Sequence, residues 1–241
     1  MELPKTLIKP TTQNPKRIVL FSSPKMGKTT FASQLENNLI IDLENGSDYV
    51  EALKLKANNF TELAEIGTAV IKAGRPYKYV TIDTITALEN WCELEATETY
   101  MNSLVGKGFN RGSDGKPLPQ NQWTSVLTLP NGAGYLWLRE SYKKRINQLS
   151  TLAPHTILVA HIKDKFLERK GKEFTAKDLD LTGKIKSITA ANSDAIGYMY
   201  RNEKSELRIT FISSDEILCG SRVEHLKGQD IEADWKKIFI N

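Results

Sequence analysis

The residues with the clearest capacity for chemistry stand in succession near the N-terminus: Gly27, Lys28 and Thr29. With the five residues before them they match the Walker A pattern, except that Ser22 stands where the pattern has glycine. In such a loop, backbone N–H groups surround phosphate oxygens, the lysine reaches the β- and γ-phosphates, and the threonine hydroxyl binds Mg²⁺. We therefore predict that ATP and Mg²⁺ bind at Ser22, Ser23, Pro24, Lys25, Met26, Gly27, Lys28, Thr29 and Thr30.

Two residues depart from the usual composition of this loop. Glycine at the first position eases a tight turn, so Ser22 is expected to adopt the same angle at some cost. Lys25 adds a second cation, which either contacts phosphate oxygens, in its own or a neighbouring subunit's nucleotide, or is solvated. The alternative for the whole segment is an ordinary strand–turn–helix with a surface lysine.

Asp83 is the second candidate for nucleotide chemistry. It ends the apolar run Tyr79–Asp83, which has the Walker B form. A carboxylate at the end of a strand beside the phosphate-binding loop can hold an Mg²⁺-bound water, so Thr29 and Asp83 are the predicted magnesium residues. A buried strand that ends in aspartate is also a common start of a turn.

Alternating strands and helices are expected to position these groups. The predicted strands are apolar runs, and the predicted helices carry apolar residues at helical spacing. The strands are Arg17–Phe21, Leu39–Asp42, Tyr79–Asp83, Thr156–Ala160, Lys184–Ala191 and Ala195–Arg201, and Glu206–Ser213 with Glu216–Cys219 forms a C-terminal β-hairpin. The helices are Lys28–Glu36, Tyr49–Ala57, Thr61–Ala73, Leu88–Tyr100 and Tyr135–Leu152. This alternation predicts an α/β fold with a mainly parallel central sheet flanked by helices.

Two stretches lack this periodicity. Met101–Gly134 is rich in Gly, Pro, Asn and Ser, and 162–182 is polar and charged. Both are predicted to be long loops, which in a compact domain are usually functional or disordered.

Composition excludes some classes of protein. The 241 residues are 40% hydrophobic and 26% charged, which is ordinary for a globular protein. The net charge of +4 permits a polyanionic partner without demanding one. No apolar run approaches the roughly 20 residues of a membrane span, so no membrane partner is expected. Cys92 and Cys219 are expected to be reduced, buried thiols.

The order of these motifs resembles the RecA family of recombination ATPases, and more closely the compact RecA-like proteins that phages encode for single-strand annealing and recombination. The resemblance extends over about 17–226. It implies a RecA-like P-loop NTPase core at 17–226, an N-terminal arm at 1–16 and a C-terminal tail at 227–241. By the same resemblance the protein would act in the cytoplasm of the bacterial host.

The resemblance also implies catalytic roles. In the segment Ile41–Glu44, a glutamate after a strand end resembles the residue that activates the attacking water, so Glu44 is the candidate general base. Its alternative is a turn carboxylate. His161 follows Thr156–Ala160, at the place where the family has a residue that senses the γ-phosphate. The alternative role for His161 is to cap the end of the strand. Arg222 would insert into a neighbouring subunit's ATP site, or be a surface charge.

Two DNA-binding loops are implied as well, the first at 101–134 and the second at 162–182. Cations for phosphates and aromatic rings for bases suit single-stranded DNA. The candidates are Lys107, Phe109, Arg111, Trp123, Lys163, Lys165, Arg169, Lys170 and Lys172. A solvated surface loop is the alternative for both.

Together the motifs predict an ATPase, and the resemblance implies that it depends on single-stranded DNA and promotes annealing or recombination. It would assemble with itself as a ring or filament, and a single-strand-binding protein would be a further partner. The competing hypotheses are a hexameric helicase-like or packaging motor, a P-loop kinase that uses 163–177 as a lid, and a nucleotide-gated module without hydrolysis.

Overall fold

The computed structural model describes residues 3, 5–169 and 172–240. The strands are β1 (Arg17–Ser22), β2 (Asn38–Asp42), β3 (Leu53–Lys56), β4 (Tyr79–Asp83), β5 (His155–Arg169), β6 (Lys172–Leu179), β7 (Ala195–Arg201), β8 (Leu207–Thr210), β9 (Gly220–Ser221) and β10 (Asp230–Glu232). The helices are α1 (Lys28–Ser33), α2 (Phe60–Lys72), α3 (Ile85–Asn102), α4 (Leu104–Phe109), α5 (Gly134–Leu149), α6 (Lys184–Ala191) and α7 (Trp235–Ile238), with short 3₁₀ turns at Gln120–Gln122, Val126–Thr128, Pro130–Gly132 and Glu224–Leu226.

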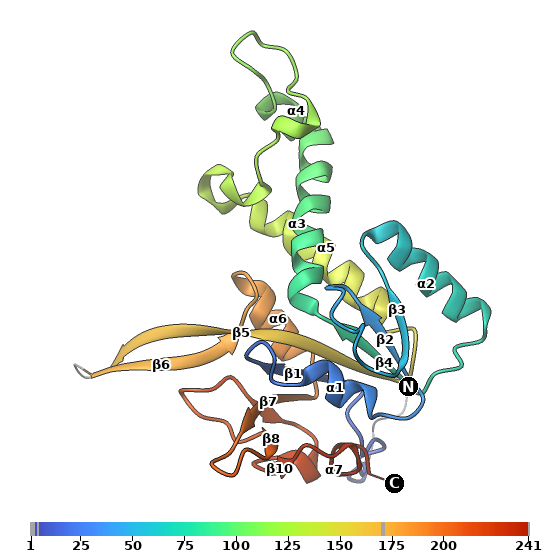
Figure 1. Ribbon diagram of the computed structural model, residues 1–241. Helices are drawn as coiled ribbons and strands as arrows, with labels where there is room; N and C mark the ends of the chain where they lie inside the picture. Colours follow the sequence, from blue (N-terminus) through green and yellow to red (C-terminus); the bar gives the residue numbers. More distant parts are fainter. Residues whose placement is uncertain (1–2, 4, 170–171, 241) are drawn as a thin grey trace.

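A single sheet runs through the molecule in the order β10-β8-β7-β1-β5-β4-β2-β3 (Figure 1). The strands from β3 to β7 in this order are parallel to their neighbours. At the other edge, β8 pairs antiparallel with both β7 and β10. The structure therefore confirms the predicted α/β class, the mainly parallel sheet and a C-terminal β-hairpin.

The pleat of the strands separates two hydrophobic cores. In β1, Val19 and Phe21 face one side of the sheet, while Ile18 and Leu20 face the other. Helices α2, α3, α5 and α6 contribute to the first core, and α1 and α7 contribute to the second. Both cysteines are buried and free. In the part of the chain that the structure describes, we find no helix of the length and apolar character that crossing a bilayer requires.

Three sequence predictions of local structure were wrong. Tyr49–Ala57 was expected as a helix, but it contains β3, whose Leu-Lys-Leu-Lys sequence has the two-residue period of a strand. Lys184–Ala191 was expected as a strand but forms α6, with Ile185 and Thr189 buried four residues apart on one face. Glu216–Cys219 does not form the second strand of the hairpin; β7 and β8 are its strands, and β9 pairs with β7.

The two predicted loops are also more ordered than expected. Residues 162–169 of β5 and 172–179 of β6 form a two-stranded antiparallel ribbon, in which Lys163 lies opposite Asp178 and Asp164 opposite Lys177. Opposite charges that face each other across two strands favour their pairing. The same charged composition, read from the sequence alone, suggested a loop. We call this hairpin the ribbon.

Residues 101–134, which we call the protrusion, extend from the body beyond the end of α3 (Figure 1). The part of the protrusion that leads back to the body is anchored there. Val126 is fully buried, and its N–H donates to the Thr97 hydroxyl at 2.9 Å. Gly134 packs so tightly on the Val126 carbonyl that a Cβ would lie 1.7 Å from the oxygen.

Residues 227–241 were expected as a tail, yet this segment supplies β10 and α7 to the core. The Trp235 ring stacks on Phe31 of α1 with centroids 4.2 Å apart, and its Nε1–H donates to the Phe31 carbonyl at 2.7 Å. A four-residue helix is too short to show a helical period, which is why the sequence did not reveal it.

We expect Trp235→Ala to lower the free energy of unfolding by about 3–5 kcal/mol, because it removes a buried aromatic ring and leaves a cavity behind α1. The matched control is Tyr49→Ala, which truncates a 99% exposed ring and should change stability by no more than about 0.5 kcal/mol. Urea denaturation measures both. Equal midpoints for the two variants would show that α7 does not stabilise the core.

Candidate nucleotide site

The candidate phosphate-binding loop lies between β1 and α1, at the edge of the sheet where the parallel strands end. Ser22 is the last residue of β1 and is fully buried. The left-handed backbone angles fall instead at Lys25 (φ 62°) and Gly27 (φ 99°). Serine at the first position therefore carries no left-handed strain, whereas the bend before α1 depends on Gly27.

Lys28 is buried inside this loop, with 8% of its surface exposed. Its ammonium donates to the Ser22 carbonyl and hydroxyl, both at 3.2 Å, and to the Ser23 carbonyl at 3.0 Å. Burial lowers the pKa of Lys28, while the charges of Asp83 and Glu44 act in the opposite direction. The loop thus holds a desolvated cation among oxygen acceptors, where a phosphate would offer stronger ones.

The Thr29 hydroxyl donates to the Asp83 carboxylate at 2.6 Å, which joins the two predicted magnesium residues. Asp83 is only 5% exposed. Burial raises its pKa; the Thr29 bond and the Lys28 charge oppose the shift, and Glu44 and Asp42 add to it. A buried carboxylate beside a hydroxyl is a donor set that suits a hard divalent cation.

Among the described residues no group of three or more histidine, cysteine or acidic side chains is placed to hold a metal ion. Mg²⁺ in nucleotide sites commonly needs only one or two protein ligands, since phosphates and water supply the rest. Thr29 and Asp83 therefore fit Mg²⁺ that arrives with a nucleotide.

Glu44 follows β2 and lies close to this pair. The Thr84 hydroxyl donates to its Oε1 at 2.8 Å, and His161 Nε2 lies 3.0 Å from Oε1 and 3.1 Å from Oε2. An ionised carboxylate only accepts hydrogen bonds, so Nε2 is the protonated nitrogen when Glu44 is charged. The structure thus brings the candidate base and the candidate sensor into direct contact.

Asp42 is a site residue whose role the sequence did not indicate. Its Oδ1 accepts from the N–H groups of Glu44 (2.9 Å) and Gly46 (3.3 Å), and its Oδ2 accepts from Ser47 N–H at 2.9 Å. Burial alone would raise the pKa of Asp42, but the hydrogen bonds from this turn outweigh burial and lower it. Asp42 therefore fixes the turn that carries Glu44; an aspartate just before Leu-Glu-Asn-Gly is the signal for such a turn.

Sheet register explains why these groups meet. Asp42 lies opposite Asp83 on neighbouring strands, and Ser22 lies opposite His161. Because all four strands are parallel, their carboxyl ends share one edge of the sheet. Side chains from β1, β2, β4 and β5 converge there although they are far apart in sequence.

Arg222 does not join this cluster within its own chain. Its backbone N–H donates to the Asp194 carbonyl, and its guanidinium donates to the Ala191 carbonyl at 2.7 Å. Asp194 precedes β7 and accepts from the N–H groups of Lys16 and Arg17, where β1 begins. Arg222 thus lies at the opposite edge of the sheet from Lys28, and its expected action in a neighbouring subunit stays a prediction.

The DNA-binding candidates lie on two separate projections (Figure 1). On the protrusion, Lys107 and Phe109 belong to α4, and Arg111 donates to the Gly115 carbonyl at 2.6 Å. Trp123 donates from Nε1 to the Leu118 carbonyl and packs against the core, so its ring also has a structural role.

On the ribbon, Lys163 pairs with Asp180 at 3.4 Å, Lys165 is exposed and Phe166 is 81% exposed. Lys170 lies outside the described residues, as do the side chains of Arg169 and Lys172. Exposed cations and an exposed ring occur together on the described part of the ribbon.

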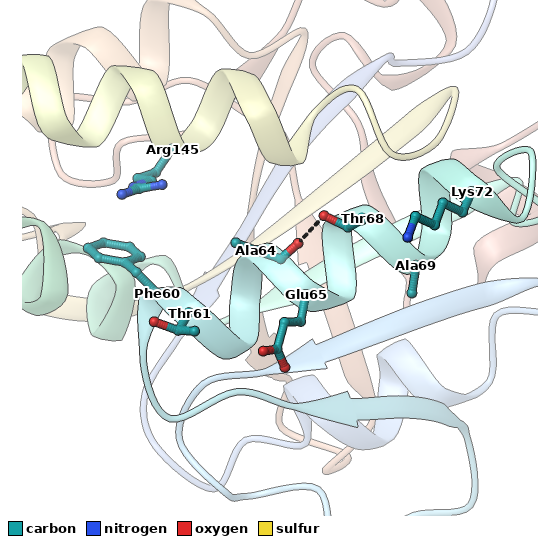
Figure 2. A pocket seen from close by; sticks show the side chains of 8 residues that line it. All are labelled: Phe60, Thr61, Ala64, Glu65, Thr68, Ala69, Lys72 and Arg145. Atoms are coloured by element: carbon teal, nitrogen blue, oxygen red, sulfur yellow. Dashed lines mark hydrogen bonds between the residues drawn. The ribbon is translucent and has the colours of Figure 1, made fainter.

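A hollow of about 690 Å³ lies between α2 and α5, away from these groups. Figure 2 shows the Arg145 guanidinium beside the Phe60 ring at one end, and Lys72 at the other. The guanidinium lies 4.1 Å from the ring centroid. Because its lining comes from α2 and α5 and includes no residue of the 22–29 loop, this hollow is not part of the candidate nucleotide site.

Comparison with known proteins gives one positive result. A family model for the AAA domain matches residues 14–225. The match begins before β1 and ends after Arg222, so it spans all the site residues described above. No curated protein matches the chain.

The neighbouring carboxylates Asp42 and Asp83 should respond oppositely to neutralisation. The pKa of Asp83 is raised in the folded protein, so its charge destabilises the fold once pH rises above the unfolded value near 3.8. The pKa of Asp42 is lowered, so its charge stabilises the fold above that value and the stabilisation is lost as pH falls through the folded pKa. Without nucleotide at pH 7, we expect Asp83→Asn to stabilise by roughly 1 kcal/mol and Asp42→Asn to destabilise by about 1–3 kcal/mol.

Thermal and urea unfolding of both variants, repeated at pH 4 and pH 7, measure this contrast. The difference in unfolding free energy between the two variants should be smaller at pH 4 than at pH 7. At pH 4 a larger fraction of both carboxyls is protonated in the unfolded chain. Destabilisation of Asp83→Asn as large as that of Asp42→Asn would show that Asp83 is held by structural contacts.

Proposed function

The chain belongs to the AAA-domain family and is a nucleotide-binding ATPase, and from that premise we propose that it hydrolyses ATP with Mg²⁺ and binds single-stranded DNA in annealing or recombination. The observation that carries the nucleotide part of the proposal is the Thr29–Asp83 hydrogen bond beside the buried Lys28. A hydroxyl, a carboxylate and a lysine in this arrangement match the parts that P-loop enzymes use for a triphosphate with its metal.

Each side chain has a defined task in this proposal. Lys28 exchanges its carbonyl partners for β- and γ-phosphate oxygens, and Thr29 and Asp83 hold the cation. Bound Mg²⁺ would neutralise charge that develops on the phosphates. Glu44 takes a proton from the attacking water, and its turn is fixed by Asp42.

His161 and Thr84 control where the Glu44 carboxylate points. Both donate to it, so the Glu44 oxygens are occupied until a competing partner arrives. A γ-phosphate near His161 would compete for Nε2–H, because phosphate oxygens are strong acceptors. Nucleotide would then free Glu44 for the water, and His161 would report the event to the ribbon that begins beside it.

The ribbon and the protrusion are the proposed contacts for DNA. Phe166 is an exposed ring that could stack on a base, and Lys163 and Lys165 precede it in the same strand, on the alternate face. Lys107, Phe109 and Arg111 repeat this combination on the protrusion. Affinity built on such contacts falls steeply with salt.

Assembly with itself, as a ring or filament, completes the proposal. The ATP site would lie between protomers, with Arg222 of one chain reaching the nucleotide of the next. A single-strand-binding protein is a further proposed partner, since both would meet on the same DNA.

Two substitutions should separate binding from turnover. Lys28→Ala should weaken ATP binding by about a hundredfold or more, because the buried cation among the loop carbonyls is lost. Glu44→Gln keeps an acceptor for Thr84 and should bind ATP normally while turnover falls by about a hundredfold or more. Calorimetry and phosphate release measure these quantities.

Matched controls are Lys72→Ala and Glu51→Gln, which alter exposed residues outside the loop and should leave both quantities unchanged. Normal turnover in Glu44→Gln would remove it as general base. Undiminished binding in Lys28→Ala would remove the loop as the nucleotide site.

Single-stranded DNA should stimulate ATP hydrolysis severalfold at low salt, and moderate salt should weaken the effect, because phosphate contacts release counterions. Replacing Lys165 and Phe166 together by alanine should reduce stimulation and leave the DNA-free rate unchanged. Phosphate release with single-stranded, duplex and no DNA is the measurement.

Turnover indifferent to DNA, without salt-sensitive binding, would contradict the DNA proposal. Phosphate transfer to an acceptor other than water would then favour a kinase, and binding without turnover would favour a gated module. ATP-driven unwinding by a stable ring would favour a motor.

A further inference from the structure

Glu89 is a buried carboxylate for which the proposed nucleotide chemistry has no use. It lies on α3 and is only 6% exposed. Burial raises its pKa; the hydrogen bonds of Thr182 oppose this, and the charges of Asp180 and Glu93 add to it. A carboxylate that faces other acids in a buried place costs free energy unless its hydrogen bonds are well placed.

The bond that holds Glu89 comes from the segment just after the ribbon. The N–H of Thr182 donates to Glu89 Oε1 at 2.8 Å. Thr182 lies just after the returning strand β6 and just before α6, beside the buried Leu181. Glu89 therefore fixes the point where the ribbon rejoins the body.

The outgoing strand of the ribbon is fixed by the same helix. The N–H of His161 donates to the Thr86 hydroxyl at 3.1 Å. Thr86 and Glu89 are three residues apart, so they lie on one face of α3. The Asp180 N–H donates to the His161 carbonyl at 3.0 Å and closes the base of the ribbon. One helix face thus holds both strands of the ribbon where they leave the core.

This end of α3 is also the end nearest the nucleotide site. The helix begins at Ile85, two residues after Asp83, and its N-cap is Thr84, whose hydroxyl donates to Glu44. A change in the position of Asp83 or Thr84 therefore moves the first turns of α3, which carry Thr86 and Glu89. Contiguous hydrogen bonds of this kind can couple two sites.

We propose that Glu89 is a positioning residue that carries the state of the nucleotide site to the ribbon, through its hydrogen bond with the Thr182 N–H. The inference rests on the proposed nucleotide binding at 22–29. His161 is bonded to α3 from the outgoing strand, and it meets the returning segment through the bond between its carbonyl and the Asp180 N–H. Glu89 gives the returning segment a bond of its own to α3. With both strands fixed to α3, the ribbon responds to nucleotide as one body.

The test is hydrogen–deuterium exchange of the full chain, with and without Mg²⁺ and a non-hydrolysable ATP analogue. In the natural protein the analogue should slow exchange in peptides covering 175–183 by about fivefold or more. In Glu89→Leu, which has no acceptor for Thr182, the slowing should fall below about twofold, while calorimetry gives an analogue affinity within about threefold. Glu89→Gln retains an acceptor oxygen and should restore the slowing.

Two further variants keep the test decisive. Glu98→Leu changes an exposed glutamate on the same helix and should behave as the natural protein does. If Glu89→Leu does not fold, Glu89→Asp replaces it, because aspartate keeps the charge and is one methylene too short to reach Thr182.

Full slowing in Glu89→Leu or Glu89→Asp would overturn the inference, and so would a failure of Glu89→Gln to restore it. Analogue binding to the natural protein without any slowing would overturn this inference and leave the proposed nucleotide site standing. Absence of analogue binding to the natural protein would overturn the nucleotide site itself.

Discussion

The Thr29–Asp83 hydrogen bond is the interaction around which the site is organised. It ties the first turn of α1, which follows β1, to the end of β4, although β5 lies between β1 and β4 in the sheet. Asp83 is buried with a hydroxyl rather than a cation as its direct hydrogen-bond donor, so its charge is poorly compensated. A fold that kept such a group for stability alone would do better with an uncharged residue. Its position is understandable when a bound cation completes the site.

Asp42 and Asp83 show how two adjacent carboxylates acquire different roles. Both end a buried strand, and they lie opposite one another in register. The chain after Asp42 folds back, so that three N–H groups surround its oxygens and stabilise the charge. The chain after Asp83 continues into α3, and the Asp83 carboxylate is left facing Thr29. Backbone direction after the strand, rather than residue type, decides which acid builds the turn and which is available to a cation.

The sequence was enough to predict structure where an apolar run of strand length adjoins a motif of polar residues. Arg17–Ser22 and Tyr79–Asp83 are continuous apolar runs next to polar residues of fixed spacing, so the two strands and the candidate residues at their ends could be located from the sequence. The contact between Glu44 and His161 depends on sheet order, which a single sequence does not fix. Secondary-structure prediction failed where the hydrophobic pattern is short or fits both a helix and a strand. Packing against the rest of the fold decides the structure of such segments, which are Leu53–Lys56, Lys184–Ala191 and the four residues of α7.

The ribbon was missed for a different reason, and that reason bears on how the molecule works. β5 is one continuous strand of 15 residues. Its first part lies between β1 and β4 in the buried sheet, and its second part pairs only with β6 among the described strands. His161 stands at the boundary between the two parts, opposite Ser22 on one side and in contact with Glu44. The charged, polar composition of this segment suggested a loop. However, β5 enters it already as an extended strand from the core, so pairing with β6 alone is enough to continue the strand outwards. The candidate nucleotide site and the outer surface are therefore connected by an unbroken strand, and a continuous strand is stiffer than a flexible loop.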